Sequence, residues 1–61
     1  MNTEKLKEIL VEKNIEQQTL AEAVGVTQAF ISYVINGYKT PSIAVMKRIA
    51  DFLGVTVDEL I

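Results

Sequence analysis

Apolar residues recur along this chain of 61 residues at the three- and four-residue spacing of amphipathic helices, and no segment alternates with the two-residue period of a strand. Near the N-terminus, Leu6, Ile9 and Leu10 share one helical face, and Asn2 or Thr3 can cap that helix. The first helix is therefore predicted over about residues 3–13. Asn14 is expected to end it, because asparagine tolerates the left-handed backbone conformation.

Glycines and capping residues divide the middle of the chain into two short helices. A second helix is predicted over about residues 17–24, and Gly25 then supplies a turn with positive φ. Thr27 is a good N-cap for a third helix over about residues 28–36, which Gly37 ends. The prediction is a pair of helices joined by a very short turn.

Capping residues and a glycine also mark helix boundaries in the C-terminal third of the chain. Ser42 is expected to cap a fourth helix that continues to Leu53 and is closed by Gly54. The segment Thr56-Val57-Asp58-Glu59 has the pattern of a capping box, with Val55 and Leu60 placed as its hydrophobic staple, so a last short helix follows. The fold class predicted for residues 1–61 is all-α, a single five-helix bundle.

The predicted third helix has two separate faces when its residues are projected at about 100° per residue. One arc contains only the apolar side chains Phe30, Ile31, Val34 and Ile35. The opposite arc contains Gln28, Ala29, Ser32, Tyr33 and Asn36, with no charge at all. Amides, hydroxyls and methyl groups are the chemistry that recognises base edges in DNA, whereas an ordinary solvated helix, the alternative interpretation, is normally rich in charges.

The net charge of −2 argues against a nucleic-acid partner when it is taken alone. The distribution of charge changes that conclusion. Residues 23–50 contain Lys39, Lys47 and Arg48 and no acid, while both ends of the chain are acidic. The middle of the chain, which includes the predicted third helix, is therefore a locally basic window without acids.

The composition also excludes several kinds of site. The chain has no cysteine and no histidine, so disulfides, the usual zinc sites and Cys-His or Ser-His nucleophiles are absent. We expect no catalytic, metal or cofactor residues and no enzymatic activity. The longest apolar run has four residues, Ile43 to Met46, which fits neither a membrane span nor a signal peptide, so a soluble protein of the bacterial cytoplasm or nucleoid is expected.

The centre of the chain contains the motif Gln17-x-x-Leu20-Ala21-x-x-Val24-Gly25-Val26-Thr27-x-x-x-Ile31-Ser32-x-x-x-Asn36-Gly37-x-x-x-Pro41-Ser42. This motif, with the tail over residues 49–60, resembles the phage-repressor helix-turn-helix family (Cro, lambda repressor and XRE proteins). The resemblance covers about residues 5–60. It implies a transcriptional regulator of phage or bacterial repressor type, whose third helix enters the major groove of double-stranded DNA. It also implies action as a dimer on a near-palindromic operator.

The resemblance further implies roles for individual residues. Positions that contact bases in relatives are occupied here by Gln28, Ala29, Ser32 and Tyr33. Positions that contact phosphates are occupied by Gln17, Asn36, Lys39 and Thr40. Three alternatives stay open: Gln17 can be a plain exposed glutamine, the Tyr33 ring can lie on a sugar-phosphate strand, and Lys39 can be a solvated loop charge. Because no arginine or lysine lies on the uncharged arc, the target is expected to favour A·T pairs.

The remaining residues of the fourth helix allow more than one interpretation. Lys47 and Arg48 are interpreted as solvated charges. Val45 and Phe52 are either additional core or part of an exposed stripe that forms a homodimer surface with Val55, Val57 and Ile61. An apolar surplus of this kind, with a net charge of −2, also leaves open a protein-interaction or antitoxin-like module on the same fold. No small-molecule ligand and no membrane partner are expected.

Overall fold

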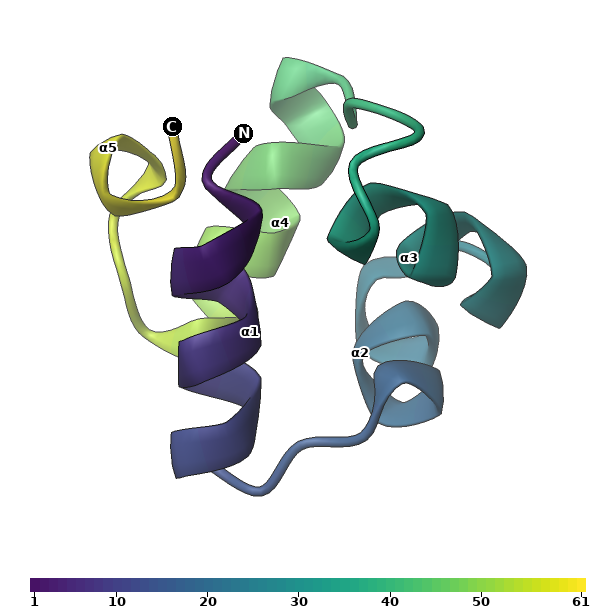
Figure 1. Cartoon of the computed structure of the whole chain (residues 1–61), viewed down its shortest axis with the longest axis horizontal. Coiled ribbons are helices and arrows are strands. Elements are labelled where there is room, and N and C mark those ends of the chain that lie inside the picture. Colours follow the sequence, from purple (N-terminus) through teal and green to yellow (C-terminus); the bar gives the residue numbers. More distant parts are fainter.

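The computed structural model describes residues 1–61 and contains five helices and no strand (Figure 1), which confirms the predicted all-α five-helix bundle. The helices are α1 (Thr3–Glu12), α2 (Gln17–Val24), α3 (Gln28–Ile35), α4 (Ile43–Leu53) and α5 (Val57–Leu60). In Figure 1, α2 and α3 form one side of the molecule, and α1, α4 and α5 form the other. None of the five has the length and apolar character needed to cross a membrane.

Side-chain caps fix where most of these helices begin. The side chains of Asn2, Thr27 and Ser42 accept hydrogen bonds from the backbone N–H groups three residues later, at 3.0, 3.0 and 3.2 Å. Thr56 and Glu59 form the predicted capping box of α5. Each cap satisfies a backbone N–H group that has no partner within the helix, and so stabilises a helix that begins at the next residue. The observed helix starts therefore follow the capping residues from which they were predicted.

The helix ends differ from the prediction at two positions. α1 ends at Glu12 and α3 at Ile35, one residue earlier than expected, and Lys13 and Asn36 serve as C-caps. Asn14 has the expected positive φ of 55°. Gly25, with φ of 79°, ends α2 and turns the chain so that the N–H of Val26 donates to the Ala21 carbonyl at 3.0 Å.

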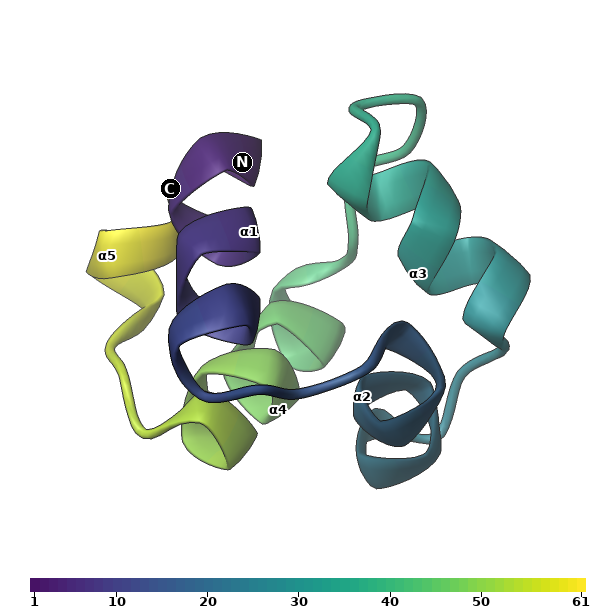
Figure 2. The same cartoon turned by 60° about the horizontal axis from the view of Figure 1, so that its bottom comes forward.

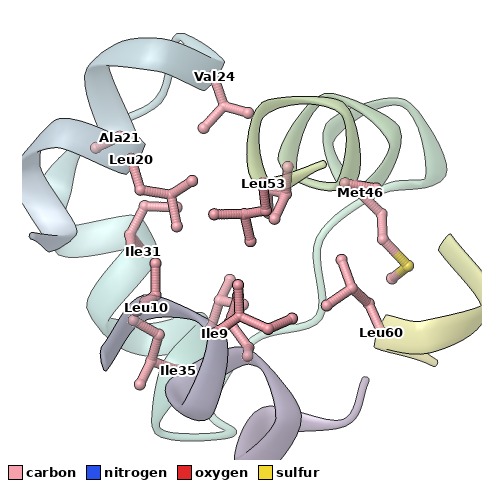
Figure 3. Close-up of a cluster of buried hydrophobic side chains, with 14 residues drawn as sticks. Ile9, Leu10, Leu20, Ala21, Val24, Ile31, Ile35, Met46, Leu53 and Leu60 are labelled. Atoms are coloured by element: carbon pink, nitrogen blue, oxygen red, sulfur yellow. The ribbon is translucent and has the colours of Figure 1, made fainter. Parts of the chain in front are cut away.

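Fourteen buried apolar side chains from all five helices form one core (Figure 3). Leu6, Leu20, Ile31, Ile49 and Leu60 are completely buried, one from each helix. The core is closed at the chain ends, where α5 packs on α1 and α4 and the N–H of Asn2 donates to the Leu60 carbonyl at 2.7 Å. The helix-turn-helix segment, α2 and α3 with the turn between them, is held by its own turn and by the packing of α2 on α4 and of α3 on α1.

The five residues predicted as extra core or dimer surface separate into two groups. Val45, Val55 and Val57 are half-buried and pack against the core. Phe52 is 43% exposed and Ile61 is 68% exposed. The core interpretation therefore holds in part for Val45 and is wrong for Phe52, whose position on α4 leaves much of the ring in solvent.

Candidate nucleic-acid interface

The uncharged face of α3, formed by Gln28, Ala29, Ser32, Tyr33 and Asn36, stands clear of the protein as predicted. All of these side chains are exposed except Ser32, which is half-buried. On the opposite face, Ile31 and Val34 are completely buried and Ile35 is 5% exposed. The two faces predicted from the sequence are therefore confirmed, with Phe30 half-buried at their boundary.

The position of α3 in the bundle makes this face accessible. α3 packs on α2 and on α1, and both views place it at the edge of the molecule (Figures 1 and 2). The turn at Gly25 and Val26 is short, so the start of α3 is fixed relative to the end of α2. The arrangement is a helix at the edge of the molecule with uncharged hydrogen-bonding groups on its outer side.

An open depression of about 810 Å³ lies beside α3, between it, the end of α1 and the start of α2. Gln17, Gln28 and Asn36 line it together, so the structure places a predicted phosphate contact from α2 next to two residues of the uncharged face. Lys7 and Glu16 also line the depression. Sequence reasoning missed Lys7, because its helix gives no indication of which exposed side chain turns towards α2.

The N-terminus of α2 adds a partial positive charge at this depression. Its N-cap residue, Glu16, makes no side-chain capping bond, so the first N–H groups of α2 have no side-chain acceptor there. Unpaired N–H groups and the helix dipole favour an anion at such an end. Gln17 is half-buried in this first turn and can offer its amide to the same anion.

The other predicted phosphate contacts lie at the far end of α3. Asn36, Lys39 and Thr40 are all exposed, and the Asn36 amide donates to the Ser32 carbonyl at 2.8 Å. The Lys39 ammonium lies over the Tyr33 ring, 5.4 Å from its centroid. The structure therefore brings together two residues for which the family resemblance implied separate roles.

Arg48 is exposed, as predicted, but it also makes a contact that the sequence did not indicate. Its guanidinium reaches from α4 to the end of α2, where Nη1 donates to the Val24 carbonyl at 3.4 Å. A cation at a helix C-terminus is favourable, because the last carbonyl groups carry partial negative charge. Arg48 thus links α4 to the helix-turn-helix turn, while Lys47 is exposed as expected.

Comparisons with known proteins agree with this geometry. A family model described as helix-turn-helix matches residues 6–60. The HTH-type transcriptional activator BcrR of Enterococcus faecalis is 38% identical over 58 residues, which are 95% of this chain and 28% of BcrR. The HTH-type transcriptional regulator AnsR of Bacillus subtilis (strain 168) is 31% identical over 61 residues, which are 100% of this chain and 53% of AnsR. The chain thus spans only about a quarter to a half of these relatives, and no solved structure matches it.

Proposed function

The chain belongs to the phage-repressor-like (XRE) helix-turn-helix family, and on that premise we propose that it is a sequence-specific regulator of transcription that places α3 in the major groove of double-stranded DNA. The observation that carries the proposal is the exposed, uncharged face of α3 on a helix whose other face is buried. An exposed helix face without charge lowers the solubility of a protein, but its amide, hydroxyl and methyl groups match the groups on base edges.

The residues of this face have complementary partners among the bases. The Gln28 amide can bond N6 and N7 of adenine together, Ser32 can donate or accept, and Ala29 can contact a thymine methyl group. Tyr33 lies at the far end of the face. Since the face has no guanidinium to pair with guanine, we propose that the preferred site is rich in A·T pairs.

Phosphate contacts on both sides of α3 hold the helix in the groove. On one side, the depression presents Gln17, the first turn of α2 and Lys7 to one DNA strand. On the other side, Lys39 and Thr40 are exposed beyond the end of α3 and are available to the opposite strand, while Asn36 lies between the two groups because it also lines the depression. Contacts of this kind fix the position of the protein without recognising sequence, and only a few cations contribute to them.

A single domain with one recognition helix covers only one half-site, so we propose that the regulator acts as a homodimer. The exposed side chains of Phe52 and Ile61, with half-buried Val45, Val55 and Val57 from the same C-terminal third of the chain, supply apolar surface for pairing. Two copies then bind half-sites about 34–36 Å apart on a near-palindromic operator. We propose repression by competition: an operator that overlaps a promoter would exclude polymerase when the dimer occupies it.

Selection of bound duplexes from a random pool tests the proposed function. We expect enrichment of A·T-rich half-sites with two-fold symmetry, separated by about one helical turn. Enrichment of G-rich sites would contradict the proposal that the uncharged face of α3 recognises A·T pairs. Recovery of a pool that is still random after several rounds would contradict sequence-specific binding itself.

A second candidate function is a protein-interaction or antitoxin-like module on the same fold. It is favoured by the exposed apolar side chains Val11 (80%), Ile43 (62%) and Ile61 (68%), together with a net charge of −2. A titration with random duplex at low salt separates the two functions. Absence of binding at micromolar protein would favour the interaction module, because even non-specific DNA binding is strong at low salt.

A further inference from the structure

We infer that Tyr33 and Lys39 form a single phosphate-directed unit, in which the Tyr33 ring positions the Lys39 ammonium against the DNA backbone and does not contact a base. The inference rests on the proposed DNA-binding function and assigns this pair of residues a role within it. It is carried by the hydrogen bonds that end α3, by the ammonium–ring distance and by the distribution of charge around α3.

The way α3 ends brings Lys39 back over the last turn of the helix. Gly37 has a φ of 81°, which reverses the chain. The Gly37 N–H donates to the Val34 carbonyl at 3.1 Å, and the Tyr38 N–H donates to the Tyr33 carbonyl at 2.8 Å. These two bonds are those of a Schellman motif, which fixes the direction of the chain as it leaves the helix.

Lys39 is tied to Tyr33 by its backbone and by its side chain. Its N–H donates to the same Tyr33 carbonyl at 3.3 Å, and its ammonium lies 5.4 Å from the centroid of the Tyr33 ring. That distance is within the range in which the ring quadrupole attracts a cation. The ring therefore restricts a side chain that is otherwise among the most flexible in proteins.

Lys39 is the only charged residue between Glu22 and Lys47 in the sequence. α3 and the segments that flank it therefore depend on this one cation for their own attraction to phosphate. A lysine held in place loses less conformational entropy on binding than a free one. Because the ammonium lies over one face of the ring, that face cannot stack on a thymine methyl group or a base.

The test compares wild type with Tyr33→Phe, Tyr33→Leu, Lys39→Met and the Tyr33→Leu/Lys39→Met double variant. Fluorescence anisotropy measures the Kd for a selected duplex and for an unrelated duplex at several salt concentrations. Tyr33→Phe keeps the ring and should bind both duplexes like wild type. Tyr33→Leu should weaken binding to both by about 2–5-fold, the range of an exposed cation–π contact. Lys39→Met should lower the salt slope by about one.

The double variant decides whether the residues act as a unit. It should bind no more weakly than Lys39→Met, because the ring has no function once the ammonium is removed. If the fold increases in Kd caused by Tyr33→Leu and Lys39→Met multiplied in the double variant, the inference would be overturned. So would a loss in Tyr33→Phe or Tyr33→Leu that is confined to the selected duplex, since that is the behaviour of a base contact.

Nuclear magnetic resonance of the free protein supplies a second readout that does not depend on the Leu variant. A ring current from Tyr33 should shift the Lys39 ε-protons upfield in wild type and in Tyr33→Phe, and unshifted ε-protons in both would overturn the inference. If wild type binds no duplex, the proposed function fails together with the inference. If wild type binds duplex but the coupling is absent, only the inference fails.

Discussion

Gly37 offers a clean test of how backbone conformation stabilises the end of α3. Its φ of 81° lies in the left-handed region, which disfavours a residue with a β-carbon. A β-carbon built at this position would have no heavy atom within 4 Å apart from those of Gly37 and its two chain neighbours. Gly37→Ala therefore introduces no clash, and its whole effect should come from the backbone.

Two opposing contributions set the magnitude for Gly37→Ala. Holding alanine in the left-handed region costs about 1–2 kcal/mol, and the lower entropy of the unfolded chain returns about 0.4–1 kcal/mol. The net loss in the free energy of unfolding should be near 1 kcal/mol, which lowers the Tm of a domain of this size by about 4–8 °C. A chain of 61 residues has about 3–9 kcal/mol of stability in total, so the variant should still fold.

Thermal and urea unfolding followed by circular dichroism at 222 nm measures this loss. Gly37→Asn is the matched variant and should lose less than Gly37→Ala, because asparagine adopts the left-handed region more readily, as Asn14 does here with φ of 55°. A Gly37→Ala protein as stable as wild type would refute the reasoning. Equal losses in the Ala and Asn variants would also refute it, since the cost would then not arise from backbone conformation.

Two further predictions concern contacts outside α3. Leu60→Ala should lower the free energy of unfolding by about 2–5 kcal/mol, because Leu60 is completely buried, while Ile61→Ala, at a position 68% exposed, should change it by less than about 0.5 kcal/mol in urea unfolding. Arg48→Gln should speed amide exchange at Gly25 through loss of the bond to the end of α2, whereas Lys47→Gln should not. Equal exchange at Gly25 in both variants would show that the Arg48 bond does not hold the turn.

Local chemistry explains why helix bounds could be predicted from the sequence. An N-cap such as Thr27 acts within three residues, and the apolar spacing of α3 specifies its buried face without information from other helices. The same locality explains the small errors. Whether α1 ends at Glu12 or Lys13 depends on fraying of the last turn, which the sequence does not specify.

Contacts between helices could not be predicted in this way. The bond from Arg48 to Val24 spans 24 residues, and nothing in the spacing of α4 indicates that its arginine reaches α2. The placing of Lys39 over Tyr33 depends on the reversal of the chain at Gly37, which sequence reasoning treated only as a helix end. The depression that joins Gln17 to Gln28 needs the packing of three helices.

The central claim is that the uncharged face of α3 recognises bases, and a binding measurement with the Gln28→Ala/Ser32→Ala double variant tests it most directly. Each lost contact should cost about 1–3 kcal/mol on a selected duplex and leave affinity for unrelated duplex nearly unchanged. Thr19→Ala, which removes an exposed hydroxyl from α2, should bind the selected duplex like wild type. A folded double variant that kept both the affinity and the sequence preference of wild type would contradict the account.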